Sequence, residues 1–192
     1  MPRLGEPGLD VVAETTHGQM KLSDDKDKKW VVLCSHPADF TPGCTTEFVA
    51  FSKEYSEFEK RNVALIGLSV DSSSSHLAWV RDIEANFGVH VPFPIIADLD
   101  MGVASLYGMI QPAMSSTAAC RAVFFIDPKG ILRAMIYYPL TTGRCVAEIL
   151  RVIDALQVND EHHVATPANW QLGDKVIVPA PQTPKEKEKR EK

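Results

Sequence analysis

The sequence predicts an α/β fold in which helices flank a central β-sheet, and three observations support this prediction. Short apolar runs typical of strands alternate along the chain with segments whose apolar residues recur at helical spacing. The 192 residues suffice for one domain with a short appendage, at about 100–200 residues per domain. Hydrophobic residues make up 45% and charged residues 23%, which excludes a disordered or collagen-like chain.

The strands are predicted from apolar runs and turn residues. Residues 11–15 and 19–22 flank His17-Gly18 and predict a hairpin. The continuous apolar runs at 30–35 and 63–70 are typical of buried strands. Farther along, a turn-forming Asp-Pro-Lys-Gly segment separates two more predicted strands, at residues 122–126 and 131–138.

Three helices are predicted from apolar periodicity. After Cys44, aromatic side chains recur at spacings of three, four and three residues and form one face of an amphipathic helix. These aromatic residues are Phe48, Phe51, Tyr55 and Phe58. A second helix is predicted at 74–87 and a third at 146–156. The second is expected to bury Leu77, Val80, Ile83 and Phe87.

The C-terminal part has a different composition. Residues 1–160 are predicted to form the domain, and residues 161–192 an extended arm that ends in a charged tail from Lys185. A short strand is expected at 175–178. Because the arm has too few apolar residues for a core of its own, we expect it to contact a second copy of the chain. A homodimer is therefore predicted.

Charge and cysteine content exclude several classes of protein. The net charge of −5 argues against nucleic-acid binding, which needs a basic face. The apolar stretches are far shorter than the roughly 18–20 residues of a membrane-spanning helix, so no membrane partner is expected. Four cysteines without Cys-x-x-Cys spacing are too few for a disulfide scaffold, and a cytoplasmic location is expected.

Residues 36–47 are the most informative segment, because they join a predicted buried strand to a predicted helix. Cys44 falls in the first turn of that helix, where free amides favour an anion, so its thiol is expected to be a thiolate near neutral pH. Pro37 and Pro42 stiffen the preceding loop. These local features leave two interpretations open, a reactive thiolate and a buried structural cysteine.

The spacing Pro37-x-x-x-Thr41-x-x-Cys44 resembles the signature of the peroxiredoxins, the AhpC/TSA family of thiol peroxidases. The resemblance extends over roughly residues 4–182 and includes segments 121–130 and 138–144. It is greatest to the one-cysteine subfamily and its archaeal and bacterial relatives. The resemblance implies a thioredoxin-like fold with no bound cofactor and no metal.

The resemblance also implies roles for the residues that match the family pattern. Cys44 would be the peroxidatic thiolate, and Thr41 would hold the peroxide and the thiolate in line. Arg121 would place a guanidinium beside Cys44, and Pro37 would shield the sulfur. Four supporting residues match as well: Glu47, Arg144, His36 and Trp79. Glu47 would orient Arg121, Arg144 would join that network, and His36 and Trp79 would line the pocket.

The activity implied is antioxidant reduction of hydrogen peroxide and small organic hydroperoxides. Cys44 would become a sulfenic acid, which an external thiol such as thioredoxin or glutathione would reduce. A homodimer, or a ring of dimers, is the expected assembly. Cys145 is the last cysteine and Cys34 and Cys120 fall in or near predicted strands, so the chain is expected to act with one cysteine. Relatives with a similar tail often continue to a resolving cysteine.

Three other functions match parts of the sequence less well. A disulfide reductase on the same fold would need a Cys-x-x-Cys pair, and residues 41 and 47 are not cysteines. A cysteine hydrolase would need a base, for which His36 and His76 are candidates, but the proline-rich loop does not resemble such a site. A redox-controlled holdase or scaffold stays open as an additional role.

Overall fold

The computed structural model describes residues 1–8, 10–25 and 28–180. The chain divides into two compact units, Met1–Val146 and Ala147–Lys192. All of the candidate site residues belong to the first unit. The assignment of 1–160 to a peroxidase domain and of 161–192 to an arm stays a prediction about function. The charged tail predicted from Lys185 lies outside the described residues.

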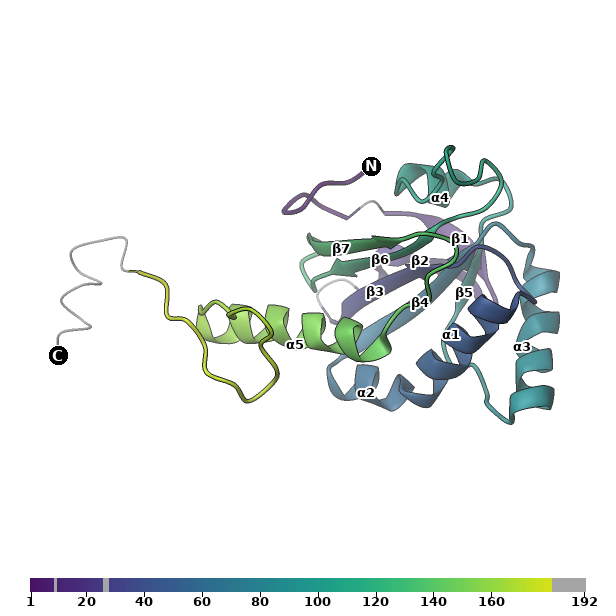
Figure 1. Cartoon of the computed structure of the whole chain (residues 1–192). Coiled ribbons are helices and arrows are strands. Elements are labelled where there is room, and N and C mark those ends of the chain that lie inside the picture. The colour runs from purple at the N-terminus through teal and green to yellow at the C-terminus, as the bar shows by residue number, and fades with distance from the viewer. Residues whose placement is uncertain (9, 26–27, 181–192) are drawn as a thin grey trace. The chain divides into compact units, whose positions relative to one another are not determined.

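The first unit is built on a seven-stranded mixed sheet, in the order β2-β1-β5-β4-β3-β6-β7 (Figure 1). The pairs β3–β4 and β4–β5 are parallel, and the remaining pairs are antiparallel. The strands are β1 (Val12–Thr15), β2 (Gly18–Lys21), β3 (Trp30–Ser35), β4 (Val63–Ser69), β5 (Ile95–Ala97), β6 (Arg121–Ile126) and β7 (Leu132–Tyr138). The mixed sheet confirms the predicted α/β fold class.

Helices lie between these strands, and one more helix follows β7. They are the 3-10 turn η1 (Leu22–Asp25) and the α-helices α1 (Pro42–Lys53), α2 (Tyr55–Lys60), α3 (Ser73–Phe87), α4 (Gly102–Leu106) and α5 (Val146–His162). In the part of the chain that the structure describes, no helix has the length and apolarity to cross a membrane.

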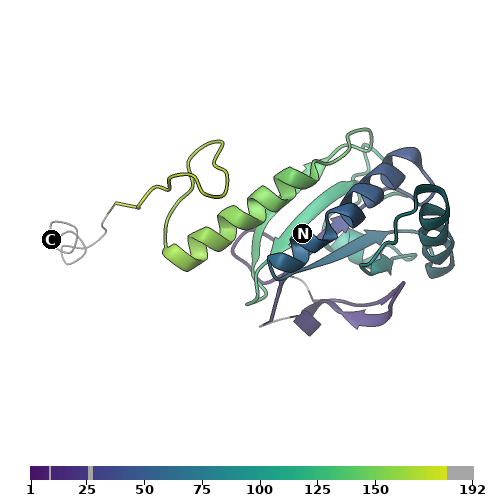
Figure 2. The ribbon, with the colours of Figure 1, turned by 90° about the horizontal axis from the view of Figure 1, so that it is seen from below.

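Strand β3 lies between β4 and β6 and is buried along its whole length. Both of its faces are covered, because α1 and α3 lie on one side of the sheet and α4 on the other (Figure 1). Figure 2 shows α1, in dark blue, lying over the sheet. This double cover explains why the strand reads as a continuous apolar run rather than as an alternating one.

An aromatic cluster fixes α1 against the sheet and against α3. The ring of Phe48 lies 4.7 Å from that of Trp79 and 5.4 Å from that of Phe93. Gly67 of β4 makes room for it, because a Cβ atom there would lie 3.1 Å from the Phe48 ring. Each fully buried aromatic side chain contributes about 1.5–3 kcal/mol. The start of α1 is thereby held in a fixed position.

Two helix predictions need correction. The helix predicted after Cys44 is interrupted at Glu54, whose ψ of 7° departs from helical values, so that α1 and α2 are separate. The interruption re-aims the chain and lets Phe51 and Phe58 both be buried, with ring centroids 6.2 Å apart.

The buried face of α3 was predicted only in part. Ile83 is buried as predicted and Val80 is half-buried, whereas Leu77 is 44% and Phe87 52% exposed. His76 and Trp79 are buried in their place. On the buried face of α3, Trp79 packs in the aromatic cluster and His76 forms hydrogen bonds. Because His76 is polar, the spacing of apolar residues did not identify this face as the buried one.

The other predicted elements of the first unit agree with the sequence patterns, whereas β5 and α4 were not predicted. The predicted hairpin forms from β1 and β2, and the Asp-Pro-Lys-Gly turn joins β6 to β7. The strand expected at 175–178 is reduced to a single bridge between Ala165 and Ile177.

Candidate active site

Cys44 lies in the first turn of α1, directly beyond the carboxyl end of β3. Thr41 is the N-cap residue, with extended backbone, and Pro42 occupies the first helical position, where its missing N–H costs nothing. The N–H of Thr45 makes the first intrahelical hydrogen bond, to the Thr41 carbonyl. The N–H groups of Gly43 and Cys44 precede this bond, and they favour negative charge at the helix start.

Arg121 brings a guanidinium to the sulfur of Cys44. Its Nη1 lies 3.4 Å from Cys44 Sγ and donates to Glu47 Oε2 at 2.7 Å. Its Nε donates to the Leu140 carbonyl at 2.8 Å. Because both ends of the guanidinium are held, the positive charge is fixed beside Sγ. Cys44 and Arg121 are both buried, so bulk water screens this charge only weakly.

Glu47 links the two arginines. Arg144 donates to Glu47 through Nε at 2.9 Å and through Nη2 at 2.8 Å, and its Nη1 donates to the carbonyls of Ser35 and Ala122. Burial alone would raise the pKa of the Glu47 carboxyl, but Arg144, with help from Arg121, holds it below its usual value. The network is therefore charged and hydrogen-bonded at neutral pH.

We predict that Glu47→Gln destabilises the fold by about 3–5 kcal/mol at pH 7, because it leaves buried arginines without their carboxylate. The pKa of Glu47 is lowered in the folded state, so its contribution is complete above the ordinary value of 4.5 and is lost as pH falls below it. The difference between wild type and variant should therefore shrink in acid. Denaturant unfolding at several pH values measures it.

The control is Glu148→Gln, which removes a partly exposed Glu–Arg pair with Arg151. That change should cost no more than about 1 kcal/mol. Equal costs for the two variants would contradict the structural role given to Glu47.

Thr41 and Pro37 lie on the loop that precedes Cys44. Both are half-buried. The Thr41 hydroxyl donates to the Ala38 carbonyl at 2.9 Å and makes no side-chain capping bond to α1. The structure thus places Thr41 at the start of the helix and Pro37 in the loop before it, and their roles toward a peroxide stay predictions.

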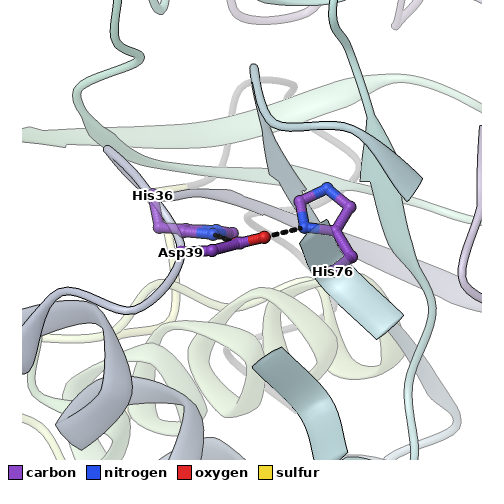
Figure 3. Close-up of side chains that lie close together, drawn as sticks. All are labelled: His36, Asp39 and His76. Carbon is purple, nitrogen blue, oxygen red and sulfur yellow. Dashed lines mark hydrogen bonds and ion pairs between the residues drawn. The ribbon is translucent and has the colours of Figure 1, made fainter. Parts of the chain in front are cut away.

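His36 is buried and bound to Asp39, a residue that the sequence pattern did not single out. Its Nε2 lies 2.9 Å from Asp39 Oδ1, and Asp39 Oδ2 lies 2.8 Å from Nδ1 of His76. Figure 3 shows the Asp39 carboxylate between the two imidazole rings. Trp79 covers His36, with rings 5.0 Å apart, and donates from Nε1 to the Thr45 hydroxyl.

Asp39 was missed because a carboxylate in a short loop is typically solvent-exposed. The donor atoms of His36, Asp39 and His76 lie within 4.8 Å of one another, close enough to serve as ligands of one metal ion. In the described structure, hydrogen bonds already join them. Burial alone would raise the pKa of Asp39, but the hydrogen bonds from His36 and His76 outweigh it and lower the pKa to about 2.

The other cysteines lie in different surroundings. Burial raises the pKa of Cys34 to about 12 and also raises that of Cys120, so both thiols stay protonated at neutral pH. Cys145 is exposed and directly precedes α5. Among the four cysteines, Cys44 is the one that contacts a guanidinium at a helix start.

Comparisons with known proteins show which family the chain resembles. The AhpC/TSA family model matches residues 4–135, and the model for the C-terminal domain of 1-Cys peroxiredoxin matches residues 155–192. A protein of Aquifex aeolicus named peroxiredoxin is 59% identical over 99% of this chain and 90% of its own length. "Peroxiredoxin 2" of Caldanaerobacter subterraneus is 59% identical over 95% of this chain and 82% of its own.

Solved structures are similar as well. A cysteine-to-serine mutant of peroxiredoxin 6 of Arenicola marina is 41% identical, with a TM-score of 0.90 over 98% of this chain and 89% of its own. A yeast mitochondrial 1-Cys peroxiredoxin is 46% identical, with a TM-score of 0.85 over 93% of this chain and 87% of its own. The chain therefore belongs to the AhpC/TSA family, the peroxiredoxins. It has the family's thioredoxin-like fold, and it is a thiol-dependent peroxidase.

Proposed function

We propose that the protein reduces hydrogen peroxide and small organic hydroperoxides through Cys44. The observation that carries this proposal is the 3.4 Å contact of Arg121 Nη1 with Cys44 Sγ at the start of α1. The thiolate attacks one peroxide oxygen, so that an S–O bond forms while the O–O bond breaks. Cys44 is oxidised to a sulfenic acid, and the departing oxygen takes a proton and leaves as water or an alcohol.

The surrounding groups stabilise the charge that moves during this step. Negative charge passes from sulfur to the departing oxygen, and fixed donors aimed at that charge lower the barrier. In our proposal the Arg121 guanidinium and the free N–H groups of the first turn of α1 supply these donors. The Thr41 hydroxyl exchanges its bond to Ala38 for one to the peroxide.

Pro37, His36 and Trp79 would keep the pocket small and dry, and the buried Glu47–Arg144 pair would hold Arg121 in place. This division of roles rests on the hydrogen bonds that Arg121 and Arg144 both donate to Glu47. It also rests on the ring contact between Trp79 and His36. A guanidinium keeps its charge at any working pH, so the field at Sγ persists.

An external thiol would complete the cycle. Its sulfur attacks the sulfenic sulfur, water leaves, and a mixed disulfide forms that a second thiol reduces. Thiol resolution in the yeast mitochondrial relative proceeds via the glutathione and thioredoxin systems, which supports these reductants here.

Assembly is proposed through the arm of residues 161–192. Leu172, Ile177 and Val178 are 62%, 51% and 61% exposed, and burial against a second copy of the chain would remove this apolar surface from water. A homodimer, alone or within a ring of dimers, and a cytoplasmic location complete the proposal.

The direct test is consumption of hydrogen peroxide and of a small alkyl hydroperoxide by the purified protein, supplied with glutathione or with thioredoxin and its reductase. We expect turnover of both peroxides with at least one reductant. A protein that consumes neither peroxide with either reductant would contradict the proposal. If it nevertheless suppresses aggregation of a denatured client protein, the holdase role applies instead.

A further inference from the structure

Gly43 lies in the first turn of α1, between Pro42 and Cys44, although its local geometry does not require a glycine. Its φ lies outside the left-handed region, and a glycine inside a helix is less favourable than an alanine. The residue is exposed, so burial does not limit the size of a side chain either. The absence of a side chain at this position therefore needs an explanation from a neighbouring group.

The neighbouring group is the guanidinium of Arg121. A Cβ atom on Gly43 would lie 2.8 Å from Arg121 Nη2 and 3.7 Å from its Cζ. Non-bonded heavy atoms are in optimal contact at about 3.5 Å or more, so a Cβ atom here would require a displacement of about 0.7 Å. The consequence of such a substitution therefore depends on how freely the guanidinium can move.

The guanidinium of Arg121 is held at several atoms. Its Nε donates to the Leu140 carbonyl at 2.8 Å, and its Nη1 donates to Glu47 Oε2 at 2.7 Å and lies 3.4 Å from Cys44 Sγ. Glu47 is itself bound by the backbone N–H and the side chain of Arg144. Because the guanidinium is one planar unit, a displacement would change these contacts together, including the one with Sγ.

The remaining nitrogen, Arg121 Nη2, is the free donor of this guanidinium. Within the part of the chain that the structure describes, the hydrogen bonds of the group use Nε and Nη1 alone. Donors in buried side chains are normally paired, so this nitrogen is available to an oxygen atom that comes from outside the chain. A side chain at position 43 would contact the same nitrogen. It would therefore alter both the approach of the guanidinium to Sγ and the access to its free donor.

We propose that Gly43 is a positioning residue for Arg121. The absence of a side chain lets the guanidinium lie against the first turn of α1, with Nη1 at the sulfur of Cys44 and Nη2 open to a substrate oxygen. The effect on peroxide rests on the proposed function. The steric effect on the guanidinium rests on the geometry alone, so the two can be tested separately.

The test is Gly43→Ala, with Gly43→Ser as a second variant that carries the same Cβ atom. In single-turnover kinetics with hydrogen peroxide we expect a rate about tenfold below wild type, because a misplacement of about 1 Å can cost about 10²-fold. Without peroxide, alkylation of Cys44 by iodoacetamide is followed by peptide mass as a function of pH. This profile should move to higher pH in both variants, because the positive charge then lies farther from Sγ.

Two further measurements separate this role from a general effect on the helix. In an Arg121→Ala background, Gly43→Ala should change the peroxide rate and the alkylation profile by no more than about twofold, because the group through which it acts is gone. Gly143→Ala is the matched control. Gly143 is also exposed and directly precedes a buried arginine, but a Cβ atom there would have no atom within 4 Å. The control should behave as wild type in both assays.

An unchanged alkylation profile in folded Gly43→Ala and Gly43→Ser would overturn the inference. It would also be overturned by an equal effect of Gly43→Ala with and without Arg121, or by an equal effect of Gly143→Ala. If the wild-type protein does not consume peroxide, the proposed function fails, and the alkylation profiles still decide whether Gly43 positions the guanidinium.

Discussion

Cys44→Ser is expected to reduce peroxide consumption to the rate of the uncatalysed reaction. Serine keeps the size and the position at the start of α1, but its hydroxyl is not ionised near neutral pH and is a far weaker nucleophile. The expected loss is therefore chemical and not structural. Steady-state peroxide assays and thermal unfolding of the same preparation measure the two effects separately.

The other cysteines provide matched controls for this experiment. Cys34→Ser and Cys120→Ser remove buried thiols whose raised pKa keeps them protonated, and Cys145→Ser removes an exposed thiol. The buried serines are expected to lower stability without abolishing the first turnover. Loss of the first turnover in any one of these three variants, comparable to that in Cys44→Ser, would contradict the assignment of Cys44.

Arg121→Ala is expected to slow the reaction with peroxide by about 10²–10³-fold, the usual cost of losing a preorganised donor. The variant loses the group 3.4 Å from Sγ, while the Glu47–Arg144 pair keeps its own hydrogen bonds. The substitution should therefore have a large effect on the rate of peroxide attack and a much smaller effect on stability, measured as the free energy of unfolding. Stopped-flow single-turnover kinetics measure that rate.

Arg121→Lys separates charge from geometry. A lysine keeps the positive charge but cannot bind Leu140, Glu47 and the sulfur with one planar group. We expect this variant to be impaired as well. A near wild-type rate in Arg121→Ala would show that the guanidinium does not act on the reacting atoms.

The strands were the most predictable part of the fold. Residues 30–35 were predicted as a strand with the bounds that β3 has, because helices cover both of its faces and a continuous apolar run results. The buried face of α3 was predicted only in part. Ile83 is buried as predicted, but His76 is buried through hydrogen bonds that an apolar pattern does not record. Which face of a helix is buried depended here on partners distant in the chain.

The candidate site was predictable only in part for a similar reason. The position of Cys44 at a helix start followed from the sequence, whereas the contacts of Arg121 with Cys44 and Glu47 join residues more than 70 positions apart. The resemblance to a family suggested those contacts, and the structure shows their geometry. Asp39 was missed because neither its loop position nor its charge indicated burial.

The most direct test of the central claim is the mass of the intact protein and its peptides after stepwise addition of peroxide without a reductant. If Cys44 is the peroxidatic thiol of a one-cysteine cycle, its peptide gains one oxygen, and excess peroxide adds a second and a third. Cys34 and Cys120 should stay unmodified at one equivalent of peroxide. A loss of two hydrogens, with a disulfide joining Cys44 to Cys120 or Cys145, would contradict the one-cysteine cycle, and a first oxygen on a different cysteine would contradict the assignment of Cys44.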